Sequence, residues 1–231
     1  MKKNKCVISL FLASCFMLSL TTTTIAASSD NNYSEESFSE AVRSLGEKYG
    51  VTVTVSSTAP DHTTLSSEQV AEELKDLENH LISGQKALEE NHRLADKAEK
   101  EIANSEKFKK NIIPQKTLSA TPTYSVQYYQ TIGSYYPNGT TILCTVVGER
   151  VYNDYYKRYL WGAVVAKNSR LYSGKGVNWD QTNCQVQRID TGRTYYVQVW
   201  GDLTEKYTKW FREYTVTSKG WRIWYEAYCP A

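Results

Sequence analysis

The stretch WRIWYEAYC, residues 221–229, alternates between two kinds of side chain. In an extended strand, successive residues point to opposite faces of the sheet. One face of this strand therefore carries Trp221, Ile223, Tyr225, Ala227 and Cys229, whereas the other carries Arg222, Trp224, Glu226 and Tyr228. The first set is the more apolar one. It predicts a strand that buries one face in a hydrophobic core.

Six further segments between residues 124 and 217 are also rich in valine, isoleucine, threonine and aromatic residues. Turn-forming sequences separate several of them, with Asn138-Gly139, Gly192 and Gly220 as the clearest examples. About seven strands with no helix-length gap between them predict an all-β antiparallel sandwich over residues 124–231. Its immunoglobulin-like form is the arrangement that we expect first.

The preceding region has a different composition. Residues 28–110 contain 17 acidic and 10 basic residues, whereas residues 111–231 contain 8 acidic and 14 basic residues. Helical spacing of apolar residues predicts one helix that begins after Ser34 and ends near Gly50, and VTVTV at 51–55 predicts a short strand. The chain therefore reads as α+β, with an acidic helical region at 28–106, a linker at 107–123 and the β-sandwich at 124–231.

A long helix over residues 67–106 is predicted by a heptad pattern that follows a capping box at Ser66 and Gln69. One apolar set contains Leu74, Leu81, Leu88, Ala95 and Ile102. The other set is weaker after its second member, and contains Val70, Leu77, Gly84, Asn91 and Ala98. Three arrangements follow from this pattern: a hairpin that folds back at Gly84, a stalk or oligomerising helix, or one helix lying on the C-terminal domain. His80 and His92 lack metal-ligand spacing, and we expect both to be exposed.

The first 27 residues have the form of a secretory signal peptide, with lysines, an apolar run of about fifteen residues and then small residues. They predict a secreted protein. An alternative is a lipoprotein anchored at Cys15, because Leu12-Ala13-Ser14-Cys15 resembles a lipobox. No later stretch approaches the length of a transmembrane helix.

Three cysteines remain after the signal: Cys144, Cys184 and Cys229. Export makes a disulfide plausible, and alternation places Cys144 and Cys229 on core faces. We therefore predict that a disulfide from Cys229 fastens the terminal strand, with Cys144 preferred over Cys184 as its partner. Three reduced, buried cysteines are the alternative, since a free cysteine packs as a small apolar group.

Several chemistries find no support in the sequence. The β-region contains no histidine, so it cannot by itself hold a Ser-His-Asp site or a histidine-bound zinc, and no glycine-rich phosphate loop is present. We predict no cofactor and no metal. A hydrolase built on paired carboxylates stays a less favoured alternative.

The aromatic residues carry the main functional hypothesis. In TYYVQVW, residues 194–200, the face opposite the expected core holds Tyr196 and Trp200, which is unusually aromatic for a solvated surface. The predicted ligand-binding residues are Tyr196, Trp200, Arg222, Trp224 and Tyr228. Aromatic rings beside positive charge favour an exported, non-enzymatic protein that binds a glycan, an anionic wall polymer or another surface protein, and not nucleic acid. A secreted toxin or antimicrobial factor acting on membranes is the alternative.

Overall fold

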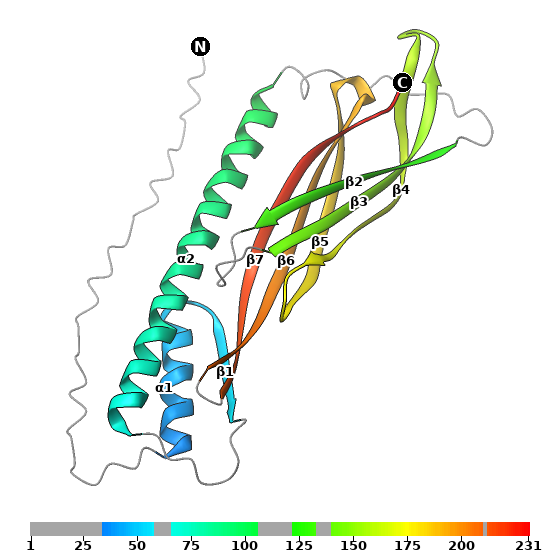
Figure 1. Cartoon of the computed structure of the whole chain (residues 1–231). Helices are drawn as coiled ribbons and strands as arrows, with labels where there is room; N and C mark the ends of the chain where they lie inside the picture. The colour runs from blue at the N-terminus through cyan, green and yellow to red at the C-terminus, as the bar shows by residue number, and fades with distance from the viewer. Residues whose placement is uncertain (1–33, 58–65, 106–121, 133–139, 210–211) are drawn as a thin grey trace, which may run out of the picture. The chain divides into compact units, whose positions relative to one another are not determined.

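A computed structural model describes residues 34–57, 66–105, 122–132, 140–209 and 212–231. These residues belong to one compact unit that spans 32–231. The expected signal peptide with Cys15, nearly all of the 107–123 linker and the Asn138-Gly139 turn lie outside the described residues. The described residues form two helices followed by antiparallel β-sheets, which confirms the α+β class (Figure 1).

The two helices begin where their caps predict. Helix α1 (Glu35–Lys48) starts after Ser34, whose side chain accepts a hydrogen bond from the Ser37 N–H. Helix α2 (Ser67–Asn104) starts after the capping box of Ser66 and Gln69, in which each side chain bonds the other residue's backbone N–H. These bonds satisfy N–H groups that have no partner inside a helix. Both helix starts are therefore fixed by local sequence.

In the part of the chain that the structure describes, seven strands form two antiparallel sheets. A four-stranded sheet has the order β1-β7-β6-β5, and a three-stranded sheet has the order β2-β3-β4. One of the sheets is curled into a half-barrel. The strand bounds are β1 (Thr52–Ser57), β2 (Thr123–Ile132), β3 (Thr140–Asn153), β4 (Arg158–Ser173), β5 (Val177–Ile189), β6 (Thr194–Lys209) and β7 (Arg212–Tyr228). Strands β2–β4 and β5–β7 are two consecutive meanders, so the strand orders do not show the expected immunoglobulin-like topology.

Strand β7 is a single strand, where the sequence predicted two strands separated by a turn at Gly220. Its register against β6 shifts between the pairs Gly201–Trp221 and Leu203–Ser218, so β7 carries one extra residue there. A bulge of this kind absorbs the extra residue without ending the strand. Because Ser218 and Trp221 pair with residues two apart on β6, they lie on the same face. The apolar face predicted from WRIWYEAYC is confirmed, and it continues back to Tyr214.

The buried face of the four-stranded sheet packs against two different parts of the molecule. At one end it faces the second sheet, where Trp161 of β4 stacks on Tyr195 at 4.6 Å between ring centroids and Tyr128 of β2 stacks on Tyr225 at the same distance. At the other end it meets the helices, which contribute Phe38 to the same buried core. The predicted helical and β regions thus share one hydrophobic core.

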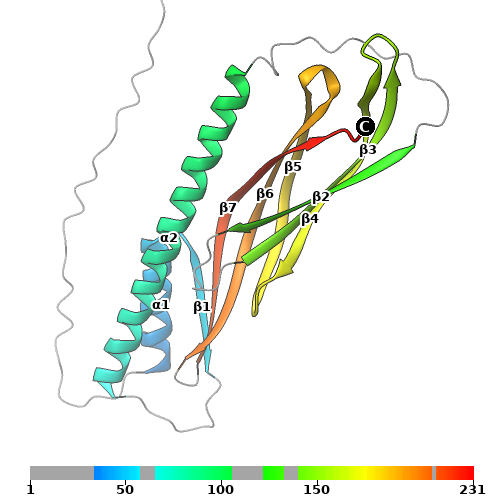
Figure 2. The same ribbon diagram turned by 45° about the horizontal axis from the view of Figure 1, so that its top comes forward.

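Helix α2 is unbroken through Gly84, so it does not fold back as a hairpin. It contacts β7 of its own chain, and both views show it running beside that strand (Figures 1 and 2). Of the three arrangements expected, a helix lying on the β-structure is the one observed. Its buried residues are Val70, Glu73, Leu77, Leu81, Gly84, Asn91 and Ala95, which include four members of the heptad set that looked weaker.

Cys144, Cys184 and Cys229 are buried free thiols, and the predicted Cys144–Cys229 disulfide is not present. Burial, together with a smaller effect of Cys184, raises the pKa of Cys144 to about 12. Burial likewise raises the pKa of Cys229 to about 11. The alternative of three reduced core cysteines is the one seen. They pack as small apolar groups within the hydrophobic core.

This arrangement predicts slow thiol chemistry in the folded protein. Without denaturant, a disulfide-exchange reagent at pH 8 should label the three core cysteines roughly a hundredfold more slowly than in denaturant, because burial limits both access and thiolate formation. In denaturant without reductant, all three should react. Recovery of only one thiol under those conditions would show that a disulfide forms after all.

Candidate functional site

Four of the five predicted binding residues lie where the second half of α2 meets the sheet. Trp200, Arg222 and Trp224 line a narrow gap with Ala95 of α2, and Tyr196 is only 4% exposed. Tyr228 is different, because it is 54% exposed and donates a hydrogen bond to Glu226. The aromatic face that looked like an open ligand platform is therefore largely covered by a helix.

The amide side chain of Asn91 holds helix α2 at an open edge of the sheet. Strand β1 pairs with β7 only as far as Thr217, and no other strand of the described residues lies beside the following part of that edge. There the Asn91 Nδ2 donates to the Arg222 carbonyl at 2.8 Å, while the Arg222 N–H donates to Asn91 Oδ1 at 2.9 Å. An asparagine amide carries the same donor and acceptor as a peptide group. Asn91 thus forms the two hydrogen bonds that a residue of a neighbouring strand would form with Arg222.

Two further contacts flank Asn91. A ring nitrogen of His92 lies 2.8 Å from the Gly220 carbonyl oxygen, and Asp96 forms an ion pair with the Arg222 guanidinium at 2.6 Å. His92 is therefore engaged with the sheet, which corrects the expectation that it is exposed. One helical stretch of α2 satisfies several polar groups along the edge of β7.

The first half of α2 carries a buried polar cluster. Both carboxylate oxygens of Glu73 are occupied, one by the Tyr214 hydroxyl and the other by Arg212 at 2.7 Å. His80 packs at 5.0 Å from the Tyr207 ring, and burial lowers its pKa, so this histidine is not exposed either. A cavity of about 240 Å³ lies beside these groups. Since Glu73 is saturated by its partners, the cluster serves to fasten α2 to the β6–β7 hairpin.

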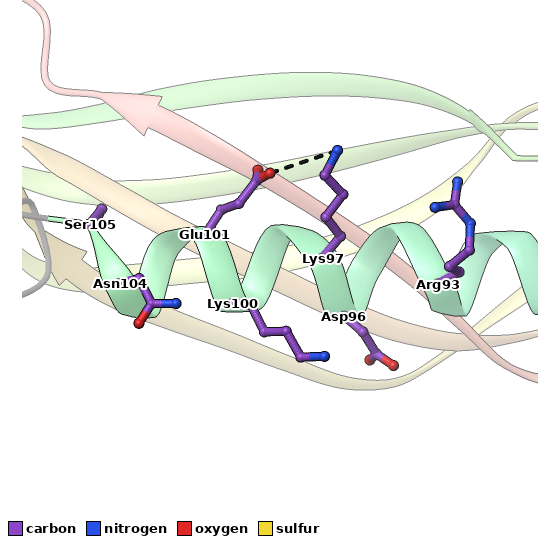
Figure 3. A pocket seen from close by; sticks show the side chains of 7 residues that line it. All are labelled: Arg93, Asp96, Lys97, Lys100, Glu101, Asn104 and Ser105. Carbon is purple, nitrogen blue, oxygen red and sulfur yellow. Dashed lines mark ion pairs between the residues drawn. The ribbon is translucent and has the colours of Figure 1, made fainter.

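A larger hollow of about 680 Å³ runs along the end of α2 (Figure 3). Its described lining comes from this one helix, and Lys97 and Glu101 form an ion pair across it. One helix face cannot enclose a ligand, so we assign no site there. Within the described ranges, no cluster of three or more His, Cys, Asp or Glu residues could hold a metal ion.

Among the residues that the structure describes, the exposed aromatic side chains are tyrosines, and all of them except Tyr228 lie away from the predicted face. They are Tyr124, Tyr129, Tyr152, Tyr155, Tyr172 and Tyr228. Tyr155 is the most exposed of them, at 79%. It lies in the hairpin that joins β3 to β4, together with Tyr152. We call residues 150–159, RVYNDYYKRY, the tyrosine hairpin.

Cross-strand pairing and cation–π contacts position the rings of the tyrosine hairpin. Tyr152 and Tyr159 are register partners and meet edge to face, at 5.2 Å between ring centroids. The Arg150 guanidinium lies over the Tyr159 ring at 3.7 Å. Such contacts favour a fixed ring orientation. These rings are therefore held in place before any ligand arrives.

The turn of the tyrosine hairpin is ordered by its own side chains. The Tyr156 N–H donates to Asn153 Oδ1 at 3.0 Å, so an asparagine side chain bonds the backbone three residues on and closes the turn. Tyr155 and Tyr156 meet edge to face at 4.9 Å, and the Arg158 guanidinium lies 5.2 Å from the Tyr156 ring. The hairpin carries three basic residues and one acidic residue. It presents flat rings beside positive charge.

The sequence contains this signal, because the interleaving of aromatic and basic residues is visible in residues 150–159. Strand alternation favoured the face of β6 and β7 instead, since alternation alone cannot show that a helix covers that face.

No family model matches the chain, and neither a curated protein nor a solved structure matches it. Among the described helices, none is long and apolar enough to cross a membrane.

The role of Asn91 can be tested by stability. Asn91→Ala should lower the free energy of unfolding by about 2 kcal/mol or more, because it leaves the Arg222 N–H and carbonyl without partners at a partly buried edge. Asn79→Ala is the matched control, since Asn79 is exposed on the same helix. Urea unfolding monitored by circular dichroism measures both. Equal stability of the two variants would contradict the account.

Proposed function

We propose that this chain is an exported, non-enzymatic binding protein that holds a cell-surface glycan or anionic wall polymer at the tyrosine hairpin. The observation that carries the proposal is the grouping of exposed, pre-oriented tyrosine rings with arginine and lysine at one hairpin. The signal-like N-terminus supports export, and the pattern of rings and charge supports the ligand class.

The chemistry of the tyrosine hairpin suits a polymer with sugar rings and negative charge. An aromatic ring offers a flat apolar face on which the CH groups of a sugar can stack, and the tyrosine hydroxyl can reach a polar partner. Arg158 and Lys157 supply positive charge for phosphate or carboxylate groups, although Lys157 also lies 3.8 Å from Asp154. A solvent-facing hairpin can contact an extended polymer without a deep pocket.

The strands that carry the tyrosine hairpin also have a net positive charge. Residues 140–173, which include β3 and β4, contain five basic residues and two acidic ones. Helix α2 has the opposite balance, with ten acidic and five basic residues over 67–104. Charges of one sign attract an oppositely charged polymer over a distance of about 10 Å at 0.1 M salt. The tyrosine hairpin is thus on the part of the chain that favours an anionic ligand.

The proposal predicts a loss of wall binding when the exposed rings are removed. In co-sedimentation with purified bacterial cell-wall sacculi, Tyr152→Ser/Tyr155→Ser should bind roughly tenfold more weakly than the parent chain, because two stacking contacts of about 0.5–1.5 kcal/mol each are lost. Tyr129→Ser/Tyr172→Ser is the matched control. It removes two exposed tyrosines, 48% and 60% exposed, from the same sheet outside the hairpin.

Three outcomes of this experiment would overturn the proposal. The parent chain could fail to bind sacculi, or both double variants could lose binding equally. In a parallel assay with vesicles of phosphatidylcholine and phosphatidylglycerol, binding to vesicles but not to sacculi would favour the membrane-active alternative. Retention of sacculus binding only by the control variant supports the proposal.

A further inference from the structure

A second possible ligand site lies between the end of α2 and the strands β6 and β7. It is a cavity of about 340 Å³, which falls near the lower end of the roughly 300–1,000 Å³ typical of small-molecule pockets. Ala98 and Ile102 of α2 form one wall, and Tyr196 and Trp224 of the sheet form the other. We call this space the aromatic groove.

A small residue on α2 keeps the aromatic groove open. Ala98 lines it at a position where a larger side chain would fill the space. Trp224 lines both this cavity and the narrow gap beside it, and it remains half-buried. An indole ring that is neither fully covered nor fully solvated offers a face to a ligand. The floor of the groove is therefore aromatic.

The charged groups that line the aromatic groove are carboxylates. Glu101 of α2 and Glu226 of β7 line it, and no lysine or arginine does so among the residues described. Burial raises the pKa of the Tyr196 hydroxyl, and the negative charges of Glu99 and Glu226 also raise it. The nearest lysine partner is Lys97, which pairs with Glu101 at 3.8 Å, and both of these side chains are mostly exposed.

We propose that the aromatic groove binds a small alkylammonium ion, that is, a quaternary or protonated amine with an apolar body. Aromatic faces attract such cations through their quadrupole, most strongly for tryptophan, and carboxylates at the rim add direct charge attraction. An anionic ligand would meet the same carboxylates unfavourably. This site is separate from the tyrosine hairpin, whose charge has the opposite sign.

Choline is the probe that tests the charge requirement most directly. Its neutral isostere, 3,3-dimethyl-1-butanol, has nearly the same shape but no charge. Titration of the full mature chain, followed by calorimetry or by tryptophan indole signals in NMR spectra, should show choline binding at least about tenfold more tightly than the isostere. Equal binding of the two ligands, or no binding of choline, would overturn the proposal.

Variants assign the binding to the aromatic groove. Trp224→Leu removes the aromatic face but retains apolar volume, and Glu101→Gln removes one rim charge; each should weaken choline binding severalfold. Glu89→Gln is the matched control, because Glu89 is exposed on the same helix but does not line the groove. If Trp224→Leu unfolds, as judged by thermal melting, then Glu101→Gln decides: choline binding equal to that of Glu89→Gln overturns the site. The sacculus assay is unaffected by this result, so the two proposals fail separately.

Discussion

The paired hydrogen bonds between Asn91 and the backbone of Arg222 determine how this molecule is organised. Strand β7 is longer than its neighbour β1, and the pairing with β1 stops at Thr217. An unpaired edge leaves backbone donors and acceptors without partners and invites pairing with another chain. Asn91 satisfies one residue of that edge from a helix. The second half of α2 is thereby held beside β7.

That position of α2 separates two kinds of aromatic residue. Trp200 and Trp224 lie beside the helix, where they help to form its contact with the sheet and the floor of the aromatic groove. In the tyrosine hairpin, Tyr152 and Tyr155 are exposed, and each meets a neighbouring tyrosine ring edge to face. Carboxylates are the charged residues that line the aromatic groove, whereas basic residues predominate in the tyrosine hairpin. Aromatic content alone therefore does not specify the ligand, and the neighbouring charge does.

Local features of the fold were predictable from the sequence. The caps at Ser34 and Ser66 act on backbone groups three residues away, and strand alternation shows which side of β7 is buried. The bulge near Gly220 was read as a turn, because only pairing with β6 shows that the strand continues. Asn91 weakened the heptad pattern in the sequence. It is buried because its amide forms a hydrogen bond with the backbone of Arg222, which is 131 residues away in the sequence.

The binding surface was harder to predict from the sequence than the local fold, because it also depends on contacts between distant segments. Alternation identified Tyr196 and Trp200 as facing away from the core, but it could not reveal that α2 covers them. The export signal and strand alternation predict a disulfide, whereas the packed core holds three thiols. In each case the deciding contact joins segments that are distant in sequence. A single sequence carries no direct information about such contacts.

Amide hydrogen exchange at Arg222 tests the central claim most directly. The Arg222 N–H points to Asn91 and not to β6, so its protection depends on α2. Residue-resolved exchange should find this amide strongly protected in the parent chain and lose most of that protection in Asn91→Ala, while the amide of Ile223 stays protected by β6. Exchange of Arg222 at the rate of an exposed amide in the parent chain would contradict the docking of α2 on the edge of β7.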